Sequence, residues 1–221
     1  MKFIALIPAR ANSIRIKNKN LIKFKGVSLV ERTIITAKKS KYLNNIFLNS
    51  DSKKILSIRK KFKNINCYLR PKYLSTSKVK MIDVIKNFIS KVELSKNDYV
   101  VLLQPTSPLR SYSDIDRCCK SILKNKSDIV VTVTKKNFNN ENNKEMYIKN
   151  KDKKTLHNSN VNLNKGKNRV VYRNGPSVLV IKLKNLKNKL YFGKINYVIV
   201  PKNRSIDINN HNDLVRLKNY K

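Results

Sequence analysis

Two apolar patterns alternate along this chain. Short, mainly apolar runs predict buried strands, and they lie at residues 3–7, 45–49, 65–69, 99–103, 129–134, 177–181 and 195–200. Apolar residues spaced three or four positions apart predict amphipathic helices, and these lie at residues 28–37, 52–62, 81–92 and 113–123. Strands that alternate with such helices are typical of a doubly wound sheet. We therefore expect residues 1–221 to form one domain, a three-layer α/β/α fold with a mostly parallel sheet.

This pattern stops between Lys135 and Val171. Asn, Lys and Glu dominate the segment, and its few apolar residues share no period. Such a long segment is unusual in a compact domain unless it has a function or pairs with something. It cannot bury a core of its own, so we expect it to be ordered against a partner. The alternative is a loop without fixed structure.

The balance of charge is strongly basic. The chain has 50 Lys and Arg against 13 Asp and Glu, a formal net charge of +37. Nucleic-acid-binding proteins have this balance, but here the basic residues are spread through every segment without one basic block. The aromatic residues lie mainly in predicted strands and helix faces, where they cannot stack on bases. The sequence therefore does not favour a nucleic-acid partner, although the charge can steer anionic substrates.

The sequence predicts neither a membrane span nor an exported protein. No stretch approaches the ~20 apolar residues that cross a bilayer. The apolar run after Met1 is too short for a signal peptide, and Pro8 interrupts it. Cys67, Cys118 and Cys119 fit neither a metal-binding spacing nor a disulfide framework. We expect a cytoplasmic protein with reduced cysteines packed in its core.

Basic residues gather in the loop after the first strand. Pro8 ends that strand, because proline has no N–H for the sheet, and Arg10, Arg15, Lys17 and Lys19 follow in a short polar segment. Ligands of α/β proteins bind where strands end, and fixed cations suit a polyphosphate. The alternative is a solvated basic loop.

A second distinctive loop, Gln-Pro-Thr-Ser-Pro-Leu-Arg at 104–110, follows the strand at 99–103 and is stiffened by two prolines. The two loops together resemble the sugar-acid cytidylyltransferase family, of the acylneuraminate cytidylyltransferase type, whose first loop reads roughly P-A-R-G-G-S-K-R-I-P-x-K-N. The residues of the first loop that match are Pro8, Ala9, Arg10, Ser13, Arg15, Ile16, Lys19 and Asn20. Ala11 and Asn12 stand where the family has two glycines.

The resemblance implies a nucleotide-diphospho-sugar transferase-like fold and a reaction of CTP with a 2-keto-3-deoxy sugar acid such as a sialic acid, giving the CMP-sugar and pyrophosphate. It implies catalytic roles for Arg10, Lys19 and Asp207. The nucleotide-binding residues it implies are Arg10, Ala11, Asn12, Ser13, Lys19, Asn20, Arg70 and Ser75. The residues it implies for the sugar are Gln104, Thr106, Ser107, Arg173 and Asn174. It further implies a homodimer in which residues 135–171 form a dimerisation arm.

The resemblance also places a magnesium site near the end of the chain. The family motif D-I-D-x-x-x-D-L holds Mg²⁺ with its first two acids; here Asp207 matches the first, Asn209 replaces the second and Asp213 matches the third. Because Mg²⁺ needs only one or two protein carboxylates beside substrate phosphates, we expect Asp207 and Asn209 as its ligands. Three alternatives stay open: a pseudaminic, legionaminic or 3-deoxy-octulosonic acid as the sugar, a catalytically impaired homologue, and a basic nucleic-acid-binding protein.

Overall fold

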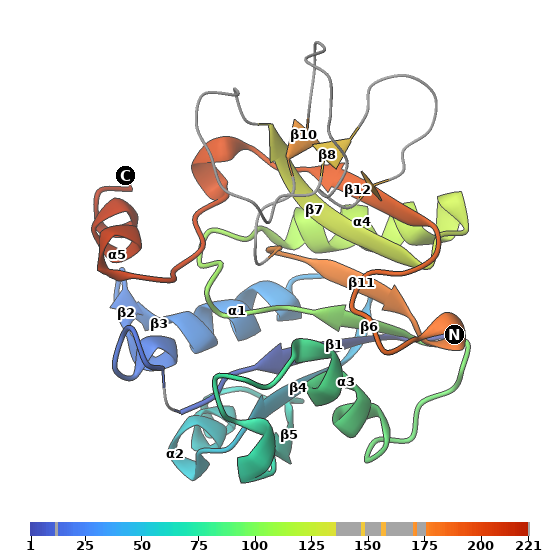
Figure 1. The fold of residues 1–221 in the computed structure, drawn as a ribbon. Coiled ribbons are helices and arrows are strands. Elements are labelled where there is room, and N and C mark those ends of the chain that lie inside the picture. The colour runs from blue at the N-terminus through green and yellow to red at the C-terminus, as the bar shows by residue number, and fades with distance from the viewer. Residues whose placement is uncertain (12, 136–146, 149–155, 158–169, 172–175, 221) are drawn as a thin grey trace.

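The structure is a computed structural model, and it describes residues 1–221 except 12, 136–146, 149–155, 158–169, 172–175 and 221. Its described strands form a ten-stranded sheet in the order β5-β4-β1-β6-β11-β7-β10-β8-β9, with β12 paired to β7 (Figure 1). The parallel half consists of β1 (Phe3–Pro8), β4 (Leu43–Ser50), β5 (Asn66–Leu69) and β6 (Tyr99–Leu102). β11 (Leu179–Lys182) runs antiparallel to β6. The predicted mixed, mostly parallel sheet is confirmed.

The other half of the sheet is built on β7 (Ile129–Lys135). It pairs parallel with β12 (Ile195–Ile199) and antiparallel with β11 and with β10 (Val170–Val171). β8 (Tyr147–Ile148) and β9 (Leu156–His157) continue from β10. These short strands lie in the segment for which the sequence predicts none, because two residues are too few to leave a period. The remainder of the predicted arm lies outside the described residues.

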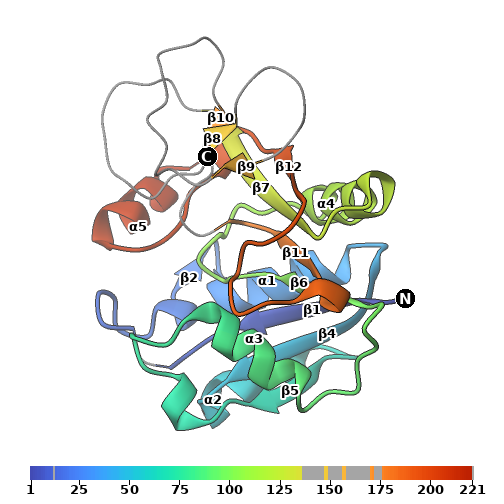
Figure 2. The same ribbon diagram turned by 45° about the vertical axis from the view of Figure 1, so that its right-hand side comes forward.

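Helices cover both faces of the sheet, as predicted. Side chains of β1 alternate, so that Ala5 and Ile7 face the cluster with α1 (Leu29–Lys38) and α4 (Tyr112–Asn125). Ile4 and Leu6 face the cluster with α3 (Met81–Ile89) and the segment at 183–195. Figure 2 shows α1 and α3 on opposite sides of β1. None of the helices in the described part of the chain has the length and apolarity needed to cross a membrane.

Shorter elements complete the fold. They are β2 (Lys23–Phe24), β3 (Val27–Ser28), α2 (Lys53–Leu56), α5 (His211–Lys218) and the 3₁₀ turns η1 (Lys19–Leu21), η2 (Ser57–Lys61), η3 (Lys72–Leu74), η4 (Leu183–Asn185) and η5 (Lys202–Arg204). The helix predicted at 52–62 is thus divided into α2 and η2. The helix predicted at 81–92 ends at Ile89, and the one predicted to begin on a Ser113 cap begins instead after Ser111.

The cysteines of α4 are core residues, as the sequence predicts. Cys118 and Cys119 are both fully buried beside α1 and the sheet. Burial raises the pKa of both thiols far above the ordinary value. Neither thiol is therefore a nucleophile at neutral pH.

Candidate active site

A cavity of about 390 Å³ lies at the carboxyl ends of the parallel strands. Its walls come from the loops after β1, β5 and β6, from the start of α3, and from three later places in the chain: Pro176, Leu190 and the segment of Asp207 and Asn209. The lining residues are Pro8, Arg10, Lys19, Asn20, Arg70, Met81, Leu102, Gln104, Pro105, Thr106, Pro176, Leu190, Asp207 and Asn209. Two loops and a carboxylate segment that the sequence singled out are thus brought together.

Backbone N–H groups of the loop after β1 bond to the end of β4 and to the residue that follows it. The Ala9 N–H donates to the Asn49 carbonyl at 2.8 Å, and the Ala11 N–H donates to Asp51 Oδ1 at 2.8 Å. The buried Asn20 donates through Nδ2 to the Arg10 carbonyl at 2.8 Å. Arg10 is therefore held at the cavity, whereas Ala11 is not among the lining residues and its N–H is occupied by Asp51.

Lys19 connects this loop to the carboxylate segment. Its Nζ donates to the Ile208 carbonyl at 2.9 Å. Burial lowers the pKa of the amine, and the nearby cations Arg10 and Arg15 lower it further, while Asp207 and Asp213 oppose both effects. The site therefore places a cation among other cations, as a polyanionic ligand requires.

The carboxylate segment has one acid in the cavity. Asp207 and Asn209 both line it, and Asn209 Nδ2 donates to Asp207 Oδ2 at 2.9 Å. Asp213, the third acid of the motif, instead accepts from the backbone N–H groups of Asn209 and Asn210 at 2.9 and 3.0 Å. It closes the capping box of α5, so its place in the motif has a structural reason.

Arg70 lies on the other side of the cavity. The residue is 5% exposed and follows β5 directly. Its Nε donates to Asn49 Oδ1 at 2.6 Å, and Nη2 donates to the Asn49 carbonyl at 3.1 Å. Burial lowers the pKa of the guanidinium to about 10, with Asp51 opposing the shift, so Arg70 keeps its charge at neutral pH.

The loop after β6 presents Gln104 and Thr106 to the cavity. The Thr106 carbonyl accepts the Ile208 N–H at 2.8 Å, which joins this loop to the carboxylate segment. Ser107 is 1% exposed and is not among the lining residues. Arg110 donates to the carbonyls of Gln104 and Ser177, so it holds the loop in shape from behind.

The remaining predicted residues divide into two groups. Ser13 and Ser75 are described and do not line the cavity; Ser75 Oγ donates to the Pro71 carbonyl at 3.4 Å. Asn12, Arg173 and Asn174 lie outside the described residues. Residues that the sequence did not indicate include Met81 and Leu190 in the cavity wall and Asn49 and Asp51 behind it.

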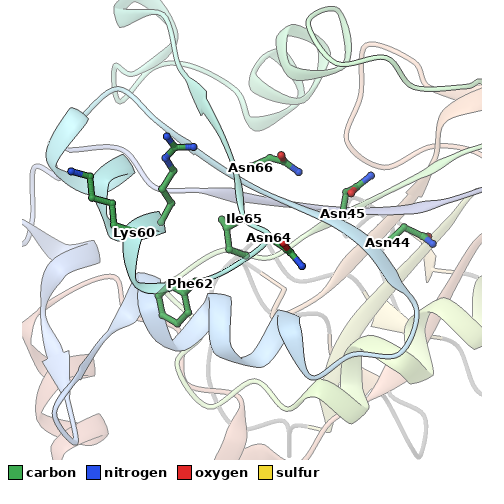
Figure 3. Close-up of a pocket in the computed structure, with 8 residues that line it drawn as sticks. Asn44, Asn45, Lys60, Phe62, Asn64, Ile65 and Asn66 are labelled. Atoms are coloured by element: carbon green, nitrogen blue, oxygen red, sulfur yellow. The ribbon is translucent and has the colours of Figure 1, made fainter.

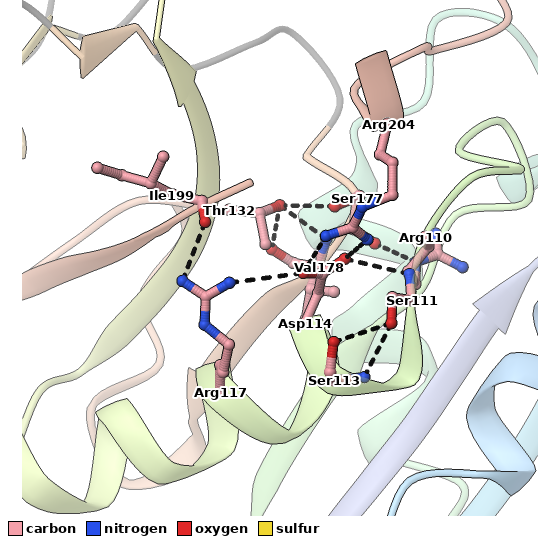
Figure 4. Close-up of polar contacts among 10 residues, drawn as sticks. All are labelled: Arg110, Ser111, Ser113, Asp114, Arg117, Thr132, Ser177, Val178, Ile199 and Arg204. Carbon is pink, nitrogen blue, oxygen red and sulfur yellow. Dashed lines mark hydrogen bonds and ion pairs between the residues drawn. The ribbon is translucent and has the colours of Figure 1, made fainter. Parts of the chain in front are cut away.

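An ion pair anchors the segment that leads to Asp207. Figure 4 shows Arg204, from η5, beside Asp114 at the start of α4. The guanidinium donates to both carboxylate oxygens, at 2.6 and 3.1 Å, and Asp114 is 1% exposed. Asp114 also accepts from the Ser111 N–H at 3.1 Å as part of the α4 capping box. The same acid, Asp114, therefore caps α4 and holds Arg204, which leads into the carboxylate segment.

A second depression lies at the opposite ends of the strands. It is an open groove of about 660 Å³ formed by the amino ends of β4 and β5 together with η2 (Figure 3). Its lining includes the exposed asparagines Asn45, Asn64 and Asn66 and two basic residues, Arg59 and Lys60. The groove carries none of the predicted site residues.

The fold and the cavity define an α/β protein with a cationic site and one lining carboxylate at the carboxyl ends of its strands. Residues 4–196 match the sequence model of the family described as Cytidylyltransferase. The chain belongs to the cytidylyltransferase family.

Named relatives are similar to this chain in sequence, and a solved structure shares its fold. The pseudaminic acid cytidylyltransferase of Campylobacter jejuni is 29% identical over 61% of this chain and 59% of its own length. The N-acylneuraminate cytidylyltransferase of Escherichia coli is 33% identical over 62% of this chain and 32% of its own length. The chain thus spans less than two thirds of these relatives. The structure of a CMP:2-keto-3-deoxy-manno-octonic acid synthetase complexed with CTP has the same fold, with a TM-score of 0.75 at 12% identity over 99% of this chain and 97% of that one.

Proposed function

We propose that this protein transfers the cytidylyl group of CTP to a sialic-acid-like nonulosonic acid and releases pyrophosphate. One observation carries the proposal: a single cavity collects Arg10, Lys19, Arg70, Gln104 and Asp207 from four separate parts of the chain. This reaction needs cations for the triphosphate, polar groups for the nucleobase and the sugar, and a carboxylate for a metal ion, and the cavity has a group for each. The relatives' names support CTP and an acidic sugar as the two substrates.

The strand order supports a proposed arrangement of the substrates. Arg70 follows β5 and Gln104 follows β6, on opposite sides of Arg10 after β1. We assign cytidine to the side of Arg70 and Asn20, the triphosphate to Arg10 and Lys19, and the sugar to the side of Gln104 and Thr106. The predicted contacts of Ala11, Ser13, Ser75 and Ser107 are not part of this assignment, because these side chains do not line the cavity.

The chemistry needs positioning and charge more than a covalent intermediate. The anomeric hydroxyl of the sugar attacks the α-phosphorus; an O–P bond forms, the bond to the β-phosphate oxygen breaks, and the hydroxyl proton is released. Lys19 and Arg10 neutralise the triphosphate and the charge that collects on the departing pyrophosphate. Fixing both substrates along one row of strand ends supplies the alignment that an in-line displacement requires.

The residues present fit a magnesium ion whose coordination is completed by the phosphates of the substrate. Among the described residues there is no cluster of three or more His, Cys, Asp or Glu that could hold a metal, but Asp207 lines the cavity beside Lys19. Mg²⁺ is commonly held by one or two carboxylates with waters and phosphates. Asp207, with the amide of Asn209, would hold it, and it would neutralise the phosphates and orient the leaving group.

The sugar is the open part of the proposal. The two relatives act, by their names, on different nonulosonic acids at 29% and 33% identity, so similarity does not choose between them. The test is CTP-dependent release of pyrophosphate with N-acetylneuraminic, pseudaminic, legionaminic and 3-deoxy-octulosonic acids, with UTP as the control nucleotide. Release with CTP and at least one acid is expected. The absence of release with every acid would overturn the proposal. A cytoplasmic homodimer, as the family resemblance implies, is part of the same proposal.

The net charge of +37 makes one alternative class worth testing. A nucleic-acid-binding protein would retain DNA or RNA on a filter, and its binding would fall steeply between low and physiological salt. We expect no retention at physiological salt. Retention with a measurable sequence or structure preference would favour the alternative.

A further inference from the structure

One edge of the Arg70 guanidinium, formed by Nε and Nη2, is bonded to Asn49. Nη1 lies on the other edge. Of the five N–H donors of an arginine, one on Nε and one on Nη2 go to Asn49, at 2.6 and 3.1 Å. In the part of the chain that the structure describes, no hydrogen bond is found for Nη1. Arg70 lines the cavity, whereas Asn49 does not. The bonds to Asn49 therefore determine which end of the guanidinium a ligand meets.

Asn49 is itself held rigidly. It is 1% exposed in β4, between β1 and β5. Its carbonyl also accepts the Ala9 N–H at 2.8 Å, and its Nδ2 donates to the Tyr68 carbonyl at 3.5 Å. The backbone of Arg70 is fixed separately, because its N–H donates to the Ser50 carbonyl at 2.8 Å. Only the side-chain torsions of Arg70 remain to be set, and Asn49 sets them.

Asp51 is a competing partner for Arg70, so the bonds to Asn49 affect the direction of the guanidinium. Asp51, two residues after Asn49, interacts electrostatically with Arg70. A guanidinium and a carboxylate form a strong two-bond pair when geometry allows. Without the acceptor on Asn49, Arg70 is free to turn toward Asp51. The amide of Asn49 is also neutral, so it orients the guanidinium without cancelling its charge.

We propose that Asn49 is a positioning residue for nucleobase recognition, which holds Arg70 so that its Nη1 donors meet a carbonyl oxygen of a pyrimidine. The inference rests on the proposed function, because it places the nucleobase on the Arg70 side of the cavity. Asn49 contacts no substrate; it acts through Arg70. Its effect should therefore fall on recognition of the base and spare the triphosphate, which the proposed function assigns to Arg10 and Lys19.

Binding measurements separate the two halves of the nucleotide. Calorimetry with CTP, UTP and inorganic tripolyphosphate should show that Asn49→Ala weakens CTP about tenfold, the effect of one charged hydrogen bond. Tripolyphosphate should bind as in wild type. Asn49→Asp keeps an acceptor oxygen at the same place but adds a negative charge that offsets the charge of Arg70, so it should recover only part of the CTP affinity. Asn45→Ala, an exposed position on the same strand, should change nothing.

The outcomes are distinct. Equal losses for CTP and tripolyphosphate in Asn49→Ala, or unchanged CTP binding, would overturn the role of Asn49 while leaving the proposed function in place. If Asn49→Ala does not fold, Asn49→Ser, with a shorter acceptor, must show the same selective loss or the inference is wrong. A wild type that binds tripolyphosphate as tightly as CTP would overturn the inference, because the base would then add nothing to binding; an absence of CTP-dependent pyrophosphate release would overturn the proposed function.

Discussion

Lys19 is the residue at which the charges of the site meet. Its amine bonds the Ile208 carbonyl and is influenced by Arg10, Arg15, Asp207 and Asp213. An ammonium aimed at a triphosphate in a partly buried site contributes substantially to transition-state stabilisation. We expect Lys19→Ala to lower kcat/KM for CTP by about 10²-fold or more. Lys17→Ala, at an exposed position in the same loop, is the matched control. The measurement is kcat/KM for CTP from pyrophosphate release by both variants. Equal values would show that Lys19 has no role in catalysis and that the loop is only a basic surface.

The pH dependence of CTP binding follows from the same amine. Burial lowers the pKa of Lys19, so in the folded protein it loses its proton at a lower pH than an exposed lysine does. The cation is therefore present below that pKa and lost as the pH rises through it. KM for CTP should rise on the alkaline side, and Lys19→Arg, whose charge persists, should flatten this rise. A pH profile that is the same in both proteins would contradict the assignment.

In the proposed magnesium site, Asn209 would determine how much negative charge the protein offers the ion. If Asp207 holds Mg²⁺ with help from the phosphates, wild type should turn over with a raised metal requirement, and Asp207→Ala should abolish turnover. Asn209→Asp adds a second carboxylate for a hard cation and should lower the Mg²⁺ concentration for half-maximal rate. A magnesium titration of the three proteins is the measurement. Turnover only in Asn209→Asp would identify wild type as an impaired homologue, and no response to metal in any protein would place the ion elsewhere.

Among the elements, η5 and α4 depend on each other through one ion pair. Arg204 makes two bonds to the nearly fully buried Asp114. Removing the guanidinium leaves a buried carboxylate with fewer partners, so Arg204→Ala should lower the free energy of unfolding by about 2 kcal/mol. Lys202→Ala, exposed in the same 3₁₀ turn, should change it by less than about 0.5 kcal/mol. Urea denaturation of both variants measures the difference, and equal midpoints would show that the pair contributes nothing.

The same pair shows what the sequence could and could not predict about elements. Ser111 and Ser113 each precede an acid by three residues, so both match the capping-box pattern. The structure caps α4 with Ser111, because Arg204 holds its partner Asp114, while Asp116 accepts from Ser40 Oγ at 2.6 Å. These partners are distant in sequence. Local spacing therefore predicts that a helix begins here, and tertiary contacts decide at which residue.

Some residues of the candidate site could likewise be predicted from local sequence, and others could not. The cavity residues Arg10, Lys19, Gln104 and Asp207 were predictable, because each stands in or beside a motif that follows a strand. Asn49 was not, since its role arises only when strand order brings β4 beside β5. Leu190 was not either. Leu183, Leu186 and Leu190 are spaced three and four positions apart, but the structure forms only the short 3₁₀ turn η4 there, so tertiary packing sets the position of Leu190.

At the scale of the whole molecule, the dimer stays a prediction that the structure makes easy to test. Lys135 of β7 pairs with Val170 of β10, so the two ends of the intervening segment are adjacent. Residues 136–169 can therefore be replaced by a two-residue Asn-Gly turn, which suits an antiparallel hairpin. Light scattering should find a dimer for the full chain and a monomer for the shortened one. A full chain that stays monomeric at high concentration would count against the dimerisation arm.

The bond between Lys19 and Ile208 joins residues 189 positions apart in the sequence, and this has a consequence for folding. Contacts of such separation form late, because their loop-closure entropy must be overcome first. The parallel strands of the first half can pair before the carboxylate segment docks, so this segment should also be the first part of the site to open in the native state. Hydrogen exchange at the Ile208 amide, which is bonded to Thr106, should therefore be faster than in β1 and should slow when CTP is added. Exchange as slow as that of β1 without ligand would show instead that the site is closed before any nucleotide arrives.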